Sequence, residues 1–487
     1  MRWQKWALVA LVCLLAFSKS GLSQEKGFDP LFTQKGAPQA FLPAALSCVG
    51  PEETIDLWEA VRQALCTHPA TRQSFAFALA QAARLGEARS EFLPQVNASA
   101  SKEARRTTSS GGFSLFGQGQ SLARYFPGIK LPGGERIDSE NQGIANVALN
   151  YLLFDFGRRK SQSQAAREAL AAANWSHDAQ TQGVILEAVQ NYARAAQGEV
   201  LRQAQEKNLA SAEEIFASAR LRHETGQVSL TDVLQAQTAR AQALLALSRA
   251  REEESVSQGE LASTMGMDIA SYLRLAPILP PQAPQIQETF EALVAEALSH
   301  RPDLAELDAQ DRQRQAEIQV ARRSRLPRFD LSSGWGALES SPDPRFRSRQ
   351  GWVGMNLTWP IFTGFAAHYR IREASALREE GQAQRQGLLR QIERDAWRGY
   401  HDLLTAKENL GTTEVLLESA THNEKAAMAR YMAGLGSILD VLSAQAALAQ
   451  ARAERIQAIS DWLLARASLA FAIGGLTPES AQGLEEQ

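Results

Sequence analysis

The chain contains two related stretches of sixteen residues, RHETGQVSLTDVLQAQ at Arg222–Gln237 and RYMAGLGSILDVLSAQ at Arg430–Gln445. Eight of the sixteen positions are identical, and they include a glycine, a serine three residues later and an aspartate six residues later. Glycine permits the backbone of a tight turn, whereas serine and aspartate favour the start of a helix. Each stretch therefore predicts a turn between two helices, and its duplication predicts an internal repeat.

The repeat covers most of the chain. The segment Ala64–Pro69 resembles Ala297–Pro302 at an offset of 233 residues, whereas Leu149 matches Leu357 at an offset of 208 residues. The difference, 233 minus 208, means that the first copy carries 25 additional residues between these landmarks. We expect the insertion within residues 102–141, as a surface loop between two strands.

Both copies show the same expected order of elements. A helix of about 35 residues, such as Ile55–Ser90, comes first, and a Leu-Pro pair ends it because proline disfavours helix. The helix-to-strand breaks are Pro94 in the first copy and Pro327 in the second. Apolar residues then alternate with other residues at 145–153 and 353–361, which predicts strands with two different faces.

Two long helices follow the strands in each copy. The first helix is expected at about 157–223 and 365–432, and each would measure roughly 100 Å at 1.5 Å per residue. After the glycine turn, a second helix runs to Met265 or Ile473. These helices show coiled-coil spacing, in the sets Ile185, Val189, Tyr192, Ala196 and Leu234, Gln237, Ala241, Leu244. One chain cannot bury such helices well, so we expect self-association.

Two strands per copy make four strands per chain. An isolated four-stranded sheet leaves exposed edges, whereas a sheet in a membrane must close into a barrel. Three chains would close a barrel of twelve strands, and the sequence offers four aromatic residues for its girdles: Tyr151, Trp335, Trp352 and Trp359. The alternative is a soluble sandwich with these residues in its core, which so few strands among several hundred helical residues disfavour.

Composition excludes several classes of protein. The 487 residues include 51 Lys and Arg against 54 Asp and Glu, a net charge of −3, so the chain is not a basic nucleic-acid binder. With 44% hydrophobic residues it is not generically disordered. What remains is a folded, alanine-rich, mainly helical protein.

The N-terminus has the pattern of a signal peptide. Arg2 and Lys5 precede an apolar run from Trp6 to Phe17, and small residues follow. Beyond residue 23, no apolar run approaches the ~20 residues that a membrane helix needs. We therefore expect an exported chain, divided into a signal peptide (1–23), an N-terminal extended segment (24–54), repeat 1 (55–274), a Pro-rich linker (275–288), repeat 2 (289–477) and a C-terminal tail (478–487).

Two cysteines, Cys48 and Cys66, remain after the signal peptide. An even pair in an oxidising compartment favours a disulfide, here one that would tie the N-terminal segment to the first helix. The alternative is two buried free thiols. Because no Cys-x-x-Cys spacing exists, the expected role is structural.

Catalytic and cofactor motifs do not occur in the sequence. His223-Glu224 lacks the second histidine of a zinc helix motif, and Gly117-x-Gly119 lacks the strand-to-helix setting of a nucleotide site. We therefore expect no enzyme, no cofactor, no metal site and no nucleic-acid partner. The arginines at 322–325 are expected on a solvated helix face or near a membrane.

Taken together, these features resemble the TolC-like outer-membrane efflux protein family, over about Ile55 to Gly475. The resemblance rests on Ala-Leu-x-x-x-Pro, the paired Leu-Pro helix exits, Leu153-Phe154-Asp155-Phe156-Gly157 and the doubled motif Arg-x-x-x-Gly-x-x-Ser-x-x-Asp-Val-Leu-x-Ala-Gln. All of these occur in order, and most are duplicated.

The resemblance implies a homotrimer in the outer membrane of a Gram-negative bacterium. Its expected fold is mainly α with a β-barrel portion: a trimeric α-barrel of long coiled-coil helices in the periplasm, continued by a 12-stranded transmembrane β-barrel in outer-membrane lipid. The chain would be the passive exit duct of a tripartite efflux pump or a type I secretion system. Its partners would be a periplasmic adaptor (membrane fusion protein) and an inner-membrane RND or ABC transporter, and the insertion in copy one would face the cell exterior. The alternative, a soluble periplasmic coiled-coil adaptor, would have one hairpin flanked by compact β modules.

Residues at the two turns carry the expected sites. The resemblance implies adaptor contacts at the periplasmic tips, through Arg222, Gly226, Arg430, Gly434 and Leu435. It also implies a periplasmic constriction formed by Asp232, Tyr431 and Asp440. Gly436 stands where the family has a locking arginine, and Ser443 stands where it has a second aspartate.

Two roles remain open for the aspartates Asp232 and Asp440. Repeated around a narrow pore, they would favour cations and bind divalent metal. Alternatively, each aspartate caps the second helix of its tip. Both roles are compatible.

Overall fold

The computed structural model describes residues 31, 54–110, 135–276, 289–341 and 347–486. The expected signal peptide, Cys48 and residues 111–134 of the insertion lie outside this description. The chain divides into two compact units. Unit 1 contains residues 1–84, 167–313 and 378–487, and unit 2 contains residues 85–166 and 314–377. The two units are described separately.

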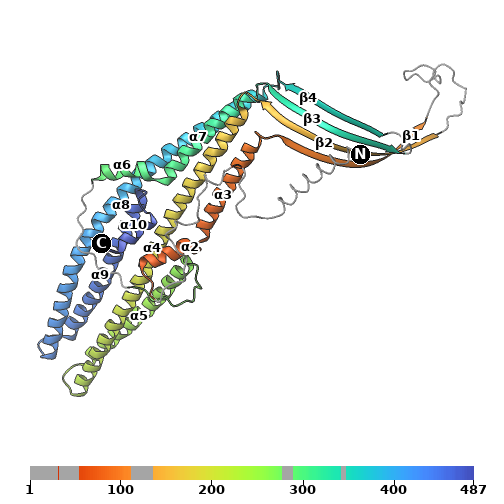
Figure 1. The fold of residues 1–487 in the computed structure, drawn as a ribbon. Helices are drawn as coiled ribbons and strands as arrows, with labels where there is room; N and C mark the ends of the chain where they lie inside the picture. The colour runs from red at the N-terminus through yellow and green to blue at the C-terminus, as the bar shows by residue number, and fades with distance from the viewer. Residues whose placement is uncertain (1–30, 32–53, 111–134, 277–288, 342–346, 487) are drawn as a thin grey trace, which may run out of the picture. The chain divides into compact units, whose positions relative to one another are not determined.

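Unit 2 contains one antiparallel sheet of four strands in the order β1-β2-β3-β4 (Figure 1). The strands are β1 (Gln95–Ser110), β2 (Glu135–Phe154), β3 (Arg328–Ser341) and β4 (Arg347–Thr358). Two strands therefore come from each copy of the repeat, which confirms the predicted number. Pro94 and Pro327 lie directly before β1 and β3.

The register of the sheet separates two faces. Tyr151 pairs with Leu331, and Leu331 pairs with Met355, so these apolar residues share one face. The opposite face is polar, and Asn356 Nδ2 donates to Ser332 Oγ there at 3.0 Å. Adjacent residues on a strand point to opposite faces, so the whole sheet alternates in this way.

Residues 102–110 and 135–141, at the two ends of the range in which the insertion was expected, belong to strands β1 and β2. Two details of the predicted strand region were wrong, both on β4. The alternating run at 353–361 ends as a strand at Thr358, because Pro360 has no N–H to donate to a ladder. Trp352 does not share a face with Trp335: Trp335 pairs with Gly351, so the next residue lies on the polar face.

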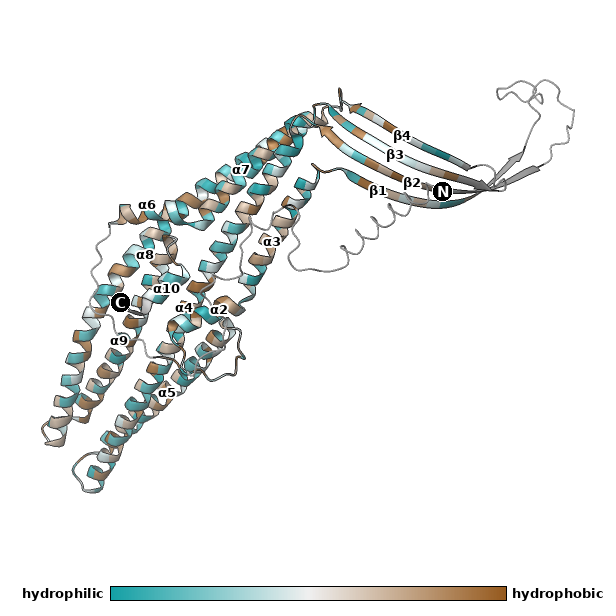
Figure 2. Ribbon diagram, viewed as in Figure 1, coloured by the Kyte–Doolittle hydropathy of each residue, from teal (hydrophilic) through white to brown (hydrophobic). Residues whose placement is uncertain are grey.

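Among the described residues, the regular elements of unit 1 are helices, and some of these helices continue into unit 2. Its helices are α2 (Leu57–Thr67), α3 (Pro69–Ser90), α4 (Arg158–Glu224), α5 (Leu230–Thr264), α6 (Phe290–His300), α7 (Pro302–Arg323), α8 (Ala366–Met432), α9 (Ile438–Ala472) and α10 (Pro478–Glu486). Figure 2 shows hydrophilic and hydrophobic residues mixed along the length of α4, α5, α8 and α9. Among the described residues, no helix combines the length and apolarity needed to cross a membrane.

The long helices confirm the predicted positions to within one residue. The helix expected over 55–90, however, is two helices, because the backbone of His68 before Pro69 is extended. Proline disfavours the helical conformation in the residue before it but is well suited to the first turn of a helix. Arg301 and Pro302 separate α6 from α7 in the same way.

The core of unit 1 contains residues from both copies of the repeat. Leu57, Ile185 and Leu261 of the first copy are fully buried in one cluster with Ala467 and Leu476 of the second. The predicted coiled-coil set that begins at Ile185 lies in the same cluster and is buried.

The second coiled-coil set, which begins at Leu234, is exposed within one chain, so its predicted packing against another helix stays a prediction. Helix α5 buries a different stripe, which includes Ala236, Leu247 and Ala250.

Two equivalent glycines allow close packing against the C-terminal ends of the short helices α2 and α6. Gly266 and Gly474 both have positive φ, +68° and +75°. A Cβ atom would lie 2.7 Å from the Thr67 side chain at Gly266 and 2.8 Å from the Arg301 backbone nitrogen at Gly474. Each copy therefore brings the end of its short helix against the end of its hairpin at a position where only glycine fits.

Candidate functional site at the helical tips and the helix-to-strand junction

The turns between α4 and α5 and between α8 and α9 have the same construction. Gly226 and Gly434 have φ values of +76° and +74°. The N–H of the next residue donates back to the carbonyl of Arg222 at 2.8 Å in the first turn and of Arg430 at 2.9 Å in the second. This is the pattern of a helix C-terminus closed by a left-handed glycine. Leu435 follows Gly434 and is 81% exposed.

Serine, not aspartate, is the N-cap of the helix after each turn. Ser437 Oγ accepts from the N–H of Asp440 at 3.3 Å, and Asp440 Oδ2 accepts from the N–H of Ser437 at 3.2 Å. At the start of α5, Ser229 Oγ likewise accepts from the N–H of Asp232 at 3.3 Å, but here the Ser229 hydroxyl itself donates to Asp232 Oδ1 at 3.1 Å. The carboxylates of Asp232 and Asp440 therefore lie in the first turn of each helix, where the positive end of the helix dipole makes a negative charge favourable.

Arg222 bridges the two tips. Its Nη1 donates to the carbonyl of Tyr431 at 3.0 Å, and its Nη2 donates to the carbonyl of Met432 at 3.0 Å. The guanidinium also lies 4.8 Å from the centre of the Tyr431 ring. Arg222 thus neutralises the exposed carbonyls at the end of α8, a favourable position for a cation. By contrast, the side chain of Arg430 is exposed and makes no hydrogen bond or ion pair within the described residues.

Tyr431 is buried between the hairpins, where it packs with Ile215, Ile438 and Val441. Its hydroxyl has no hydrogen-bond partner among the described residues. Burial raises the pKa of the Tyr431 phenol, and the charge of Arg222 opposes this shift. Sequence reasoning predicted Arg222 as an adaptor contact and Tyr431 as part of a constriction, but it did not predict that they touch.

A second polar site lies where β2 meets α4, in unit 2. Asp155 Oδ1 accepts from the N–H of Gly157 at 3.1 Å, and its Oδ2 accepts from the N–H of Arg159 at 2.7 Å. Phe156 and Gly157 between them have φ values of +54° and +84°. The Asp-Phe-Gly sequence therefore makes the sharp turn from strand to helix, with the aspartate capping the first helical N–H groups.

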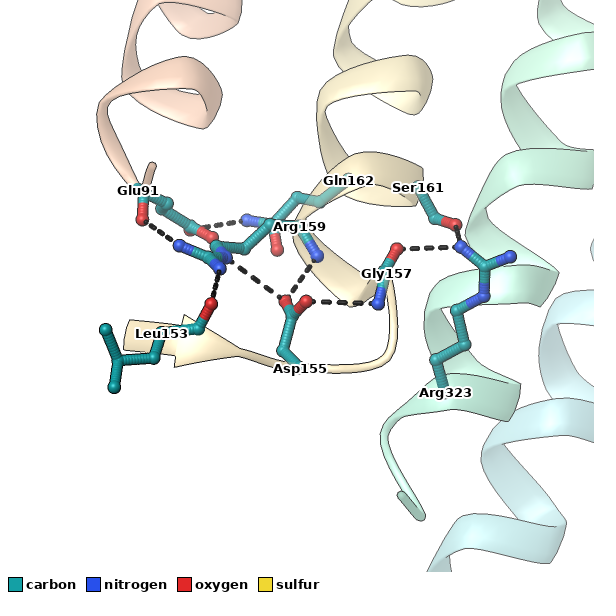
Figure 3. A network of polar contacts seen from close by, with 8 residues as sticks. All are labelled: Glu91, Leu153, Asp155, Gly157, Arg159, Ser161, Gln162 and Arg323. Atoms are coloured by element: carbon teal, nitrogen blue, oxygen red, sulfur yellow. Dashed lines mark hydrogen bonds and ion pairs between the residues drawn. The ribbon is translucent and has the colours of Figure 1, made fainter. Parts of the chain in front are cut away.

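Two arginines fasten this turn to its neighbours (Figure 3). The buried Arg159 donates to the carbonyls of Glu91 at 3.1 Å and Leu153 at 3.4 Å, and its guanidinium lies 4.8 Å from the Phe92 ring centre. Arg323 Nη1 donates to the carbonyl of Gly157 and to Ser161 Oγ, both at 2.7 Å. Arg323 was expected on a solvated face or near a membrane, but it is half-buried in this network.

The remaining site predictions concern cysteines and metals. Cys66 is buried and disulfide-bonded; because Cys48 lies outside the described residues, their pairing stays a prediction. Within the described parts of the chain, no group of three or more His, Cys, Asp or Glu side chains could hold a metal ion.

Comparison with known proteins agrees with this architecture. The sequence model of the family described as outer membrane efflux protein matches residues 60–267 and 293–475. Protein CyaE of Bordetella pertussis is 30% identical over 449 residues, which cover 90% of this chain and 84% of CyaE. The pyoverdine export outer membrane protein OpmQ of Pseudomonas aeruginosa is 26% identical, over 72% of this chain and 74% of OpmQ.

A solved structure shares the fold. The CmeC outer membrane channel of Campylobacter jejuni aligns with a TM-score of 0.72 and 19% sequence identity, over 88% of this chain and 89% of CmeC. The family match covers well over half of the chain and falls on both copies of the repeat. The chain therefore belongs to the outer membrane efflux protein family and is an outer-membrane exit channel of the kind that serves efflux or type I secretion.

Proposed function

We propose that three copies of this chain assemble into one duct, in which three four-stranded sheets close a twelve-stranded barrel in outer-membrane lipid. The observation that carries the proposal is the sheet itself. Within the described residues, β1 and β4 each pair on one side only, and the apolar face is exposed, with Val353 77% and Met355 68% accessible. Open edges and an apolar face are both costly in water, and closure in a membrane removes both costs.

The helices would continue the duct in the periplasm. Residues on α5 at coiled-coil spacing, such as Leu234 and Leu244, are exposed in one chain and would pack against a neighbouring copy. The tips would meet a periplasmic adaptor, with Leu435 and the neighbouring Leu439 as exposed apolar contacts. Asp232, Tyr431 and Asp440 would form the constriction at the same end.

The duct would conduct passively. Members of the family are channels rather than enzymes, and an inner-membrane transporter coupled through the adaptor would supply the energy. The relative OpmQ is named for pyoverdine export, and a cargo handed over by a transporter in this way would pass through the present chain without a chemical step.

Cysteine cross-linking tests the closure of the sheet. Val96 on β1 and Met355 on β4 both lie on the apolar face, since Val96 pairs with Leu149 and Met355 pairs with Leu331. In a closed trimer, oxidation of the variant V96C/M355C, or of V96C/L357C for the neighbouring register, should give a ladder of covalent species that ends at three chains.

The single variants V96C, M355C and L357C are the controls, and none of them should give the ladder. A ladder that ends at two chains, or one that continues past three, would contradict the trimer. Failure of every β1–β4 pair to cross-link would contradict closure through these edges.

A further inference from the structure

A groove of about 430 Å³ lies beside the helix-to-strand junction of unit 2. It is formed where β2 and β4 end and β3 begins, and where α4 begins and α7 ends. Its ionisable lining consists of four arginines and two acids: Arg158, Arg159, Arg323, Arg328, Glu91 and Asp155. The excess of two positive charges predicts an anionic ligand.

The two acids are already occupied by the protein. Both oxygens of Asp155 accept backbone N–H groups of the β2–α4 turn. Glu91 Oε1 accepts from Gln162 Nε2 at 2.8 Å, and the backbone carbonyl of Glu91 accepts from Arg159. These carboxylates therefore hold the junction together and offer little to a cation in the groove.

The arginines retain unused donors. The side chain of Arg158 is exposed and has no hydrogen bond or ion pair among the described residues, although its backbone N–H donates to the carbonyl of Asp155 at 3.2 Å. Arg328 is 53% exposed and contacts Asp330 at 3.3 Å from its Nε. Arg159, by contrast, is only 7% exposed and directs its Nε to Asp155 Oδ2 at 3.4 Å, so it serves the junction rather than a ligand. A guanidinium presents several N–H groups in a plane, which suits bidentate binding of a carboxylate or phosphate.

The groove opens on the polar face of the sheet. Arg328 pairs with Thr358, and Asp330, two residues along, pairs with Asn356 of the polar face. Leu152 pairs with Asp330 from the other side, and it lines the groove with Arg328 and Thr358. In a barrel whose apolar face meets lipid, this polar face is the lumen wall.

We infer that this groove is an oxyanion-binding subsite in the lumen of the duct, with Arg158 and Arg328 as the contacting residues. It takes carboxylate or phosphate groups, either as free ions or on an anionic cargo segment in transit. Arg159 and Arg323 hold the backbone that presents the two contacting arginines. The inference rests on the proposed function, because barrel closure makes the polar face the lumen wall and three-fold assembly repeats the subsite around it.

Binding of a labelled hexa-aspartate peptide to the purified full-length protein in detergent tests the subsite. We expect the wild-type protein to bind the peptide and Arg158→Gln/Arg328→Gln to bind it about tenfold more weakly. Because the attraction is electrostatic, wild-type affinity should fall as salt is raised. Inorganic sulfate as competitor separates the two sources: displacement at low millimolar sulfate assigns a site for free anions, and resistance assigns a site for an anionic segment.

Arg325→Gln is the matched control, because Arg325 is an exposed arginine two residues from Arg323 that does not line the groove. It should leave the affinity unchanged. Equal binding of hexa-lysine, or unchanged hexa-aspartate affinity in the double variant, would overturn the inference.

Conductance of the same preparations in planar bilayers separates this inference from the proposed function. If the wild-type protein forms channels that hexa-aspartate blocks, and the double variant forms channels of equal conductance with weaker block, both stand. Channels that the peptide does not block overturn the subsite alone. A protein that forms no channels overturns the duct, and with it the placement of the groove in a lumen.

Discussion

At the scale of single residues, the tip depends on an arginine from the other copy of the repeat. Gly436 leaves no side chain where the family resemblance predicts a locking arginine, but Arg222 on α4 reaches the end of α8 and covers the ring of Tyr431. The contact joins the two hairpins of one chain. We interpret it as the feature that keeps the two tips together within a protomer.

Arg222→Gln should loosen the end of α8. Loss of the two charge-assisted hydrogen bonds to its carbonyls removes about 1.4 kcal/mol of local stability, so amide exchange around residues 431–437 should become about tenfold faster. Hydrogen exchange with mass spectrometry measures this effect. The matched variant Arg430→Gln removes an arginine that has no partner in the described residues, and it should leave exchange unchanged; equal effects of both variants would refute the specific role of Arg222.

The buried phenol of Tyr431 predicts a dependence on alkaline pH. Burial raises its pKa in the folded state, so its contribution to stability is fully present below the unfolded-state pKa and is lost as pH rises through the folded pKa. The melting temperature of the wild-type protein should therefore fall more steeply with rising pH, above about pH 10, than the melting temperature of Tyr431→Phe. Parallel pH profiles for the two proteins would show that Tyr431 does not titrate in this environment.

At the scale of elements, most of the architecture was predictable from local pattern. The long helices could be located because helical periodicity continues over more than sixty residues, so single residues that do not fit the pattern have little effect on the prediction. The break at Pro69 was missed because the apolar pattern continues across it, although proline and the residue before it disfavour an unbroken helix. The end of β4 was missed in the same way, since alternation continues past Pro360.

The polar contacts at the helix-to-strand junction could not be predicted from the sequence for a different reason. Arg159 and Arg323 lie far apart in the chain, and only the turn at Gly157 brings both against the same backbone. The Asp-Phe-Gly sequence was a visible signal for that turn, but nothing local identifies which of several arginines fastens it. The contact of Arg222 with Tyr431 could not be predicted either, because it joins residues from different copies of the repeat.

Arg159→Gln should destabilise the junction. The side chain is buried, and its truncation leaves the carbonyl of Glu91 without its donor and removes the cation paired with the buried Asp155, which costs about 3 kcal/mol. The melting temperature of the purified protein measures the loss. Arg158→Gln changes the adjacent exposed arginine and should leave the melting temperature nearly unchanged, so equal destabilisation by both variants would contradict the network.

At the scale of the whole molecule, one chain, as far as the structure describes it, leaves sheet edges unpaired and apolar surfaces exposed. Its sheet has two edges that pair on one side within the described residues, its apolar face is exposed, and helix α5 leaves the stripe of Leu234 and Leu244 uncovered. The sequence predicted both the sheet and that stripe, but burial of the stripe requires a second copy. The proposed self-association would explain all three features together.

Single-particle imaging of the mature protein purified in detergent tests this account most directly. We predict a particle with three-fold symmetry, in which β1 of one chain pairs with β4 of the next and twelve strands close around one pore. A monomeric particle, or an assembly in which the β1 and β4 edges remain unpaired, would contradict it.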